Sequence, residues 1–120
     1  AIGARAADIF NFSSGIADFT RMAHVADAAR RPYWHGSEID LGIMEAGYVH
    51  VAAASAGCTM PSDIFGRQVR ESDLLREPLA FTGDSVLVPS GPGLGVELDE
   101  GELSRYEVSR SQVTAGGTDD

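Results

Sequence analysis

Residues 89–100 have the sequence PSGPGLGVELDE, which closes a run of alternating short apolar segments and amphipathic helical segments. Three of the apolar segments end in polar or reactive side chains: ADIFNFSS at residues 7–14, RPYWHGSEID at residues 31–40 and TMPSDIFG at residues 59–66. Strands that present polar groups at their C-terminal ends, and are followed by helices, build the active sites of β/α barrels. The pattern therefore predicts a piece of an enzyme.

Hydrophobic periodicity predicts the order of the elements in the first 66 residues. We expect a buried strand at residues 7–12, a helix at residues 16–29, a very short strand at residues 33–34, a helix at residues 41–55 and a third strand around residues 59–63. The second helix is apolar nearly all round, which indicates burial on more than one side. Two strand–helix units followed by a strand predict a parallel sheet with right-handed crossovers.

The pattern changes after Gly66. We expect a short polar helix or turn at residues 71–76, a hairpin at residues 81–89 that turns at Gly83 and Asp84, and a short helix at residues 99–106 that Asp99 opens. Residues 109–120 contain almost no apolar side chains, so a disordered tail is expected there.

The charge balance excludes some classes of partner. The 120 residues include 18 acidic and 9 basic side chains, for a net charge of -9, whereas nucleic acids and anionic membranes require clustered Lys and Arg. We therefore expect neither a nucleic-acid nor a membrane partner. All nine basic residues are arginines, and the lack of lysine removes Schiff-base chemistry and a lysine general base from this chain.

The single cysteine, Cys58, cannot form an internal disulfide, which favours a cytoplasmic protein. Its setting among Ala, Gly and Thr residues predicts a plain thiol rather than a nucleophile. No apolar run approaches the roughly 20 residues of a membrane span, and no signal peptide is visible. Because Ala1 is not a methionine and the chain opens within a pattern, we expect a truncated piece of a longer protein.

Taken in order, four groups of segments resemble the C-terminal part of the mandelate racemase/muconate lactonizing enzymes of the enolase superfamily. They are ADIFNF followed by GIADFTRMAHVADAA, YWHGSEIDLGI followed by VHVAAA, PSDIFG, and EPLAFTGDSVLVPSGPGLGVELDE. The last is the most specific, and the resemblance covers about residues 6–106. Family members combine an N-terminal capping domain with a modified (β/α)₈ barrel, of which this chain resembles well under half.

The resemblance implies an α/β fold in which residues 1–66 form strands six to eight of the barrel. Residues 67–108 would return to pack on the capping domain, and residues 109–120 would form the tail. The family binds Mg²⁺ through three carboxylates on strands three to five and abstracts a proton next to a substrate carboxylate, the metal stabilising the enediolate. Those strands, and a lysine base motif on strand two, are not among these residues, so no metal ligand is expected here.

Asp63 is the best-placed candidate for catalysis. PSDIFG occupies the position of an acidic motif on the family's eighth strand, where a glutamate often faces the substrate carboxylate. A protonated carboxyl group there can donate a hydrogen bond to the developing enediolate oxygen, although Asp is one methylene shorter than Glu. The alternative is that Asp63 caps a following turn.

His35 is the second catalytic candidate. It follows the second strand, where mandelate racemase-like members carry a base histidine that is paired with an aspartate on strand six. Asp8 in the preceding strand makes such a pair conceivable, and a carboxylate would orient the imidazole and raise its basicity. A structural histidine, hydrogen-bonded in its loop, is the alternative.

Ser13 lies near the position where muconate lactonizing and dipeptide epimerase members place an acid/base lysine. A serine cannot take a proton at neutral pH unaided, so two-base racemisation is not expected at this position. Instead Asn11, Ser13 and Ser14 are predicted to hydrogen-bond the substrate, assisted by backbone donors at the start of the following helix.

Two acidic residues follow His35 in the next loop. Glu38 is a candidate contact to the substrate, with solvent exposure as the alternative. Asp40 is predicted to cap the helix that starts near Leu41.

Two functions of different classes are compatible with the sequence. The first is part of an enolase-superfamily racemase, cycloisomerase or dehydratase, an isomerase or lyase that acts on a small carboxylate with Mg²⁺ and assembles as a homo-oligomer when complete. The second is a catalytically silent fragment with a structural or assembly role, because the metal-binding strands and the lysine bases are absent from these residues. Three barrel strands in isolation leave unpaired edges, which promotes association.

Overall fold

The first half of the chain is built on a short parallel pair of strands. In the computed structural model, which describes residues 2–36, 39–109 and 111, β1 (Phe10–Phe12) lies beside β2 (Tyr33–His35). Asn11 is opposite Trp34 in this register. The connection between the two strands is α1 (Ile16–Ala28), so the predicted strand–helix–strand unit is confirmed.

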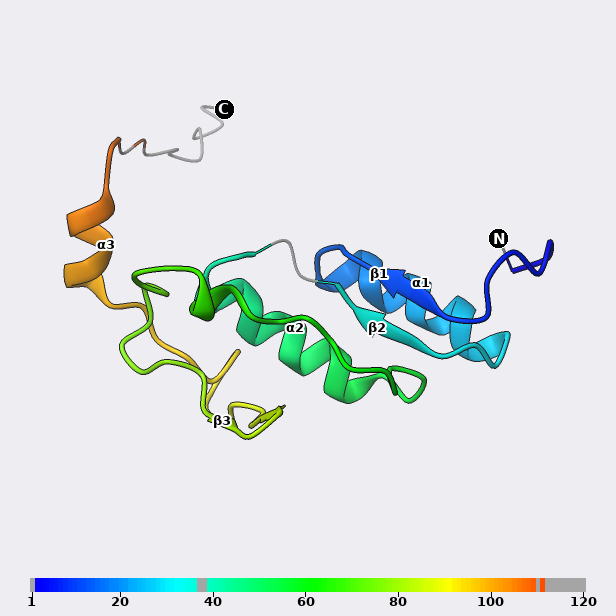
Figure 1. Cartoon of the computed structure of the whole chain (residues 1–120). Helices are drawn as coiled ribbons and strands as arrows, with labels where there is room; N and C mark the ends of the chain where they lie inside the picture. Colours follow the sequence, from blue (N-terminus) through cyan, green and yellow to red (C-terminus); the bar gives the residue numbers. More distant parts are fainter. Residues whose placement is uncertain (1, 37–38, 110, 112–120) are drawn as a thin grey trace, which may run out of the picture.

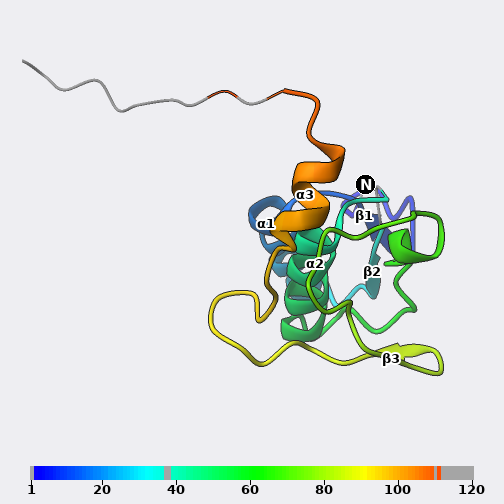
Figure 2. The same cartoon turned by 90° about the vertical axis from the view of Figure 1, so that its left-hand side faces the viewer.

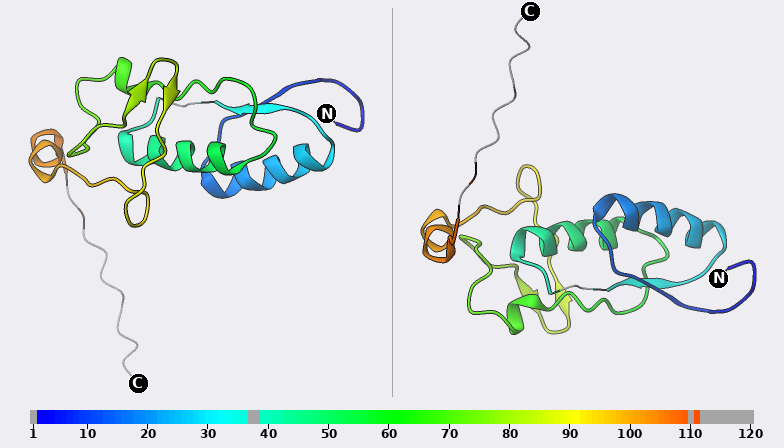
Figure 3. Two further views of the ribbon diagram at one scale, coloured as in Figure 1. Left: turned by 90° about the horizontal axis from the view of Figure 1, so that it is seen from below. Right: turned by 90° about the horizontal axis from the view of Figure 1, so that it is seen from above.

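Both long helices lie on one side of this strand pair (Figure 3). α1 is followed by α2 (Gly42–Ala54), and the two helices contact one another (Figure 1). α1 ends where Arg30 takes a left-handed conformation, with φ of 54°, and Pro32 follows two residues later. The middle of α2 is buried all round, over residues 45–49, as its apolar composition predicts.

The core consists of two clusters on the helix side of the strands. The first joins Phe19, Ala23 and Ala26 of α1 to Tyr33 of β2. The second joins α2 to the chain that follows it; its buried members are Ala46, Tyr48, Val49, Ile64, Leu75 and Leu79. Burying a large apolar side chain contributes about 1.5–3 kcal/mol, so the first cluster holds α1 against the strands and the second holds α2 against the chain that follows it.

The predicted third strand is not a regular strand. Residues 59–63 run beside β2, and the backbone N–H groups of Met60 and Asp63 donate to the carbonyl oxygens of Tyr33 (3.4 Å) and His35 (3.3 Å). The ladder is irregular between them, because these two donors are three residues apart whereas their acceptors are two apart, and the His35 N–H donates to the Ser62 side chain (3.0 Å). The segment therefore keeps the expected place without a strand's pairing.

The described residues after α2 form only short elements. After η1 (Gly66–Gln68), the predicted hairpin is present as β3 (Phe81–Thr82) and β4 (Ser85–Val86), with Gly83 at φ of 62° in the turn. α3 (Glu100–Tyr106) lies at one end of the molecule (Figure 1), so that it stands in front of α2 when the molecule is viewed from that end (Figure 2). Its predicted cap is confirmed, since Asp99 accepts hydrogen bonds from the backbone N–H groups of Gly101 and Glu102.

Residues 71–76 form neither a helix nor a simple turn. Leu75 pairs with Leu98 in an antiparallel bridge, and the Arg76 N–H donates to the Glu97 carbonyl oxygen at 2.9 Å. This contact joins the end of the glycine-rich stretch to the segment that follows η1. Most of the predicted tail, 109–120, lies outside the described residues.

No helix in the described part of the chain has both the length and the apolar character needed to cross a bilayer.

Candidate functional site

Of the predicted site residues, Asn11 lies on the side of the strands that the helices leave open. Phe10 and Phe12 pack towards α1, and Asn11 between them is exposed on the opposite side, because successive side chains of a strand alternate. Ser13, the first residue after β1, is exposed. Asp63 is exposed as well, and its neighbour Ile64 is buried against α2.

Asn11 reaches towards the end of β2. A Cβ atom at Gly36, the residue after β2, would lie only 2.9 Å from Nδ2 and 3.0 Å from Cγ of Asn11. Such distances are shorter than van der Waals contact, so a glycine is needed here for the amide to occupy its place. The Asn11 amide therefore lies against the end of β2, where the Asp63 N–H also donates to the His35 carbonyl oxygen.

His35 lies on the other side of the sheet. Its side chain is 0% exposed, and its ring stacks between Phe19 (centroids 4.5 Å apart) and Tyr48 (4.1 Å). Neither ring nitrogen has a hydrogen-bond partner among the described residues. Burial lowers the pKa of the imidazole below its ordinary value of 6.5, and nearby backbone and carboxylate groups offset this only in part.

The predicted pair of Asp8 with His35 is not formed. The Asp8 carboxylate is exposed and accepts a hydrogen bond from Arg31 at 2.8 Å, ahead of β1 and β2 in the chain. His35 is in register with Phe12, at the opposite end of the strand pair. The two side chains are thus separated by the length of the strands.

The other two predicted substrate contacts are Ser14 and Glu38. Ser14 is half-buried, and its Oγ is covered without a hydrogen-bond partner among the described residues. Glu38 lies outside the described residues, so its predicted contact has no structural counterpart here.

Asp40 does not cap α2 as predicted. The helix starts at Gly42 with Leu41 in the cap position and no side-chain cap, and the Gly42 N–H donates to the Asp73 carbonyl oxygen at 3.2 Å. Instead, the Asp40 carboxylate accepts a hydrogen bond from the Tyr48 hydroxyl at 2.5 Å. Because Tyr48 stacks on His35, this bond joins the loop after β2 to the aromatic core.

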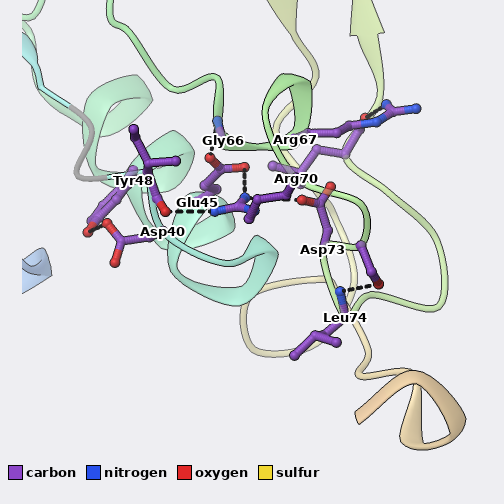
Figure 4. A network of polar contacts seen from close by, with 11 residues as sticks. Asp40, Glu45, Tyr48, Gly66, Arg67, Arg70, Asp73 and Leu74 are labelled. Atoms are coloured by element: carbon purple, nitrogen blue, oxygen red, sulfur yellow. Dashed lines mark hydrogen bonds and ion pairs between the residues drawn. The ribbon is translucent and has the colours of Figure 1, made fainter. Parts of the chain in front are cut away.

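A buried ionic cluster, formed by Glu45, Arg70 and Asp73, lies beside the same loop (Figure 4). The Glu45 side chain, 1% exposed, accepts the Gly66 N–H at 2.6 Å and lies 3.3 Å from Arg70. Arg70 also donates to the Ile39 carbonyl oxygen (2.9 Å) and to Asp73 (3.0 Å). Burial raises the pKa of Glu45, and the Arg70 charge and the Gly66 N–H act against that shift.

This cluster was not predicted from the sequence. Its signal was present, since Glu45 is the only charged residue in the otherwise apolar segment 42–54. A carboxylate in a helix that is buried all round needs a partner, and an arginine is the usual one. The partner could not be identified from spacing, because Arg70 is 25 residues away in an irregular segment.

Within the described residues, no three His, Cys, Asp or Glu side chains gather closely enough to hold a metal ion. Cys58 is half-buried, and burial raises the pKa of its thiol, which keeps it protonated at neutral pH. This agrees with the plain thiol that its surroundings predict.

Comparison with known proteins identifies the class. The family model described as "Enolase C-terminal domain-like" matches residues 1–102. Muconate cycloisomerase 1-1 of Acinetobacter lwoffii is 31% identical over 104 residues, which are 83% of this chain and 27% of that protein. Muconate cycloisomerase 1 of Rhodococcus opacus is 32% identical over 85 residues, or 71% of this chain and 23% of that protein. The chain belongs to the mandelate racemase/muconate lactonizing enzyme family of the enolase superfamily.

Solved structures show the same fold. The muconate cycloisomerase of Pseudomonas fluorescens superposes with a TM-score of 0.83 at 25% identity, over 90% of this chain and 31% of that one. The L-Ala-D/L-Glu epimerase of Bacillus subtilis superposes with a TM-score of 0.71 at 23% identity, over 79% of this chain and 27% of that one. The chain thus has the α/β fold of the enolase-superfamily barrel, and it spans less than a third of the length of these relatives.

Proposed function

We propose that this chain is part of an enzyme that abstracts the proton next to the carboxylate group of a small molecule. Membership of the enolase superfamily supports the reaction class. The observation that carries the proposal for this chain is the meeting of Asn11 and the Asp63 segment at the end of β2, where the Asn11 amide lies against Gly36 and the Asp63 N–H donates to the His35 carbonyl oxygen.

In this proposal residues 1–66 supply strands six to eight of a barrel, and residues 67–108 return to pack on a capping domain. Large apolar side chains that are exposed in this chain support the packing of further protein against it. Ile9 before β1 is 41% exposed, and Val25 on α1 is 60% exposed. A cavity of about 730 Å³, lined by apolar residues such as Leu41, Leu74 and Leu103, lies beside α3 and suits the packing of a further domain.

Asp63 is proposed to face the substrate carboxylate and to hydrogen-bond the oxygen on which negative charge develops. Asn11 and Ser13 are proposed to orient the substrate through their amide and hydroxyl groups. His35 is assigned a packing role, because a fully buried ring cannot touch a substrate and additional chain can only cover it further.

Cycloisomerisation is the reaction class that we propose to assay first, since the relatives named above are muconate cycloisomerases. Ser13, near the acid/base lysine position of these relatives, indicates that any proton transfer at that position differs from theirs. In keeping with the family resemblance, we place the Mg²⁺ ligands on segments outside this chain; the described residues do not form a metal site.

The first test is the mass of the native polypeptide that carries this segment. A product near the size of a complete barrel enzyme supports the proposal, whereas a native product of 12.7 kDa would instead support the silent fragment with a structural role. With the long product, exchange of a substrate α-proton for solvent deuterium, dependent on Mg²⁺, measures the chemistry directly.

The role of Asp63 is tested by Asp63→Asn, which keeps the shape of the side chain and removes its acid. We expect turnover to fall at least a hundredfold, as when one group that stabilises the developing oxyanion is lost, with metal binding retained. Asp84→Asn at the exposed tip of the hairpin is the matched control and should leave turnover unchanged. Normal turnover in Asp63→Asn would remove Asp63 from the mechanism.

A further inference from the structure

The buried ionic cluster of Glu45, Arg70 and Asp73 is poorly explained by stability alone. The side chains of these residues are 1%, 15% and 8% exposed, respectively. Removing charges from water costs several kcal/mol per ion, and well-packed apolar residues in place of a buried ion pair are often as stable or more stable. The cluster is therefore expected to hold particular groups in place.

The cluster has backbone partners in two segments beside the candidate site: the turn after Asp63 and the loop after β2. Glu45 accepts the Gly66 N–H at 2.6 Å, three residues after Asp63. Arg70 donates to the carbonyl oxygen of Ile39 at 2.9 Å, in the loop after β2. The ion pair of Glu45 on α2 with Arg70 (Figure 4) thus joins the loop after β2 to the turn after the third segment.

Both contact points have local features that fit this arrangement. Ile39 has φ of 59°, a left-handed conformation that is strained for a β-branched residue and persists only when its surroundings enforce it. Gly66 is buried, and a Cβ atom there would collide with Glu45 Oε1 and with the Arg70 guanidinium. The chain at residue 66 can therefore approach the ion pair closely only as glycine.

Asp73 completes the cluster from the opposite direction. Its carboxylate accepts from Arg70 at 3.0 Å, and its carbonyl oxygen accepts the N–H of Gly42 in the first turn of α2. The guanidinium is thereby held by hydrogen bonds to Ile39 and Asp73 and by the ion pair with Glu45, in three directions that a lysine could not reproduce. Glu45 and Arg70 thus fix one another, and through one another the two backbone segments.

We propose that Glu45 and Arg70 are positioning residues, which fix the loop after β2 relative to the turn after Asp63 and so set the place of the Asp63 carboxylate in the site. Neither residue touches the substrate in this account. The effect on turnover rests on the proposed function, whereas the effect on the two backbone segments does not.

Amide hydrogen exchange of the complete polypeptide tests the positioning role without any assay of activity. In Glu45→Met, a substitution of similar volume, we expect the Gly66 amide and peptides spanning residues 39–42 to exchange at least tenfold faster, with α1 unchanged. Glu45→Gln keeps an acceptor for the Gly66 N–H and should restore part of the protection. Glu97→Met, at the exposed pair with Arg76, is the control and should change neither segment.

Unchanged exchange at Gly66 in Glu45→Met, or equal acceleration in α1 and in the two segments, would overturn the proposal. If Glu45→Met does not fold, Glu45→Gln and Arg70→Lys decide by the same criterion. Faster exchange that is confined to the Gly66 amide and residues 39–42 supports the proposal.

Kinetics then test the connection to Asp63. Glu45→Gln should lower kcat about tenfold, as expected for a small misplacement of a reacting group, with KM changed less than twofold. In an Asp63→Asn background it should have no further effect, because there is no carboxyl group left to position. If Glu45→Gln lowers kcat by the same factor in the wild type and in Asp63→Asn, this connection is overturned. A wild-type protein without activity would refute the proposed function, and the exchange experiment would still decide the positioning role.

Discussion

Replacing Tyr48 by phenylalanine isolates a single hydrogen bond in the wall behind the candidate site. The hydroxyl donates to the Asp40 carboxylate at 2.5 Å, and the side chain is only 3% exposed. Phenylalanine keeps the ring that stacks on His35 at 4.1 Å, so packing is retained. Hydrogen bonds to charged groups contribute about 1.5–3 kcal/mol, and we expect the free energy of unfolding to fall by that amount in Tyr48→Phe.

The measurement is urea unfolding of the complete polypeptide at pH 7, followed by circular dichroism. Tyr106→Phe is the matched control: Tyr106 is 41% exposed on α3, and the same substitution there should change the free energy of unfolding by less than about 0.5 kcal/mol. A double-mutant cycle with Asp40→Asn assigns the loss to this bond if the two effects are not additive. A loss below about 0.5 kcal/mol in Tyr48→Phe would refute the assignment of a structural role to Asp40.

Three further substitutions test the core, the buried histidine and the last helix. Phe19→Ala removes a fully buried ring and should lower the free energy of unfolding by about 3–5 kcal/mol, measured by urea unfolding. The pKa of His35 is lowered in the folded state, so the unfolded state binds more protons below pH 6.5 and the free energy of unfolding falls as the pH falls. His35→Phe should therefore lose less stability than the wild type between pH 7 and 5, measured by urea unfolding at each pH. Asp99→Ala should destabilise α3 by about 0.5–2 kcal/mol and speed its amide exchange, whereas Asp99→Asn should not.

The sequence predicted the elements whose signals are local. The bounds of α1 follow from apolar periodicity and from Pro32, and the turn at Gly83 follows from its composition. Asp99 was identified as a cap because its carboxylate precedes the first turn of α3. Each of these features depends on residues within a few positions of one another, where propensity and steric rules act.

Features that depend on distant partners were not predicted. Asp40 precedes α2 as a capping residue would, but the Tyr48 hydroxyl competes for its carboxylate and the Gly42 N–H finds a carbonyl oxygen at Asp73 instead. Glu45 similarly depends on Arg70, which the chain brings to it only after the third segment has returned beside β2. Such partners are fixed by tertiary structure, which a single sequence does not reveal.

The side of the strand pair on which His35 lies depends on the alternation of side chains along a strand of only three residues. Tyr33, Trp34 and His35 are all able to pack in an apolar environment, so the sequence lacks the alternation that would show which side faces the helices. A shift of one residue exchanges the two sides of a strand. In the structure Trp34 is opposite Asn11 and shares its side, and therefore His35 must point at Phe19 and Tyr48. The same alternation that withdraws His35 from the site presents Asn11 to it, and without His35 the proposed chemistry depends on the acid of Asp63.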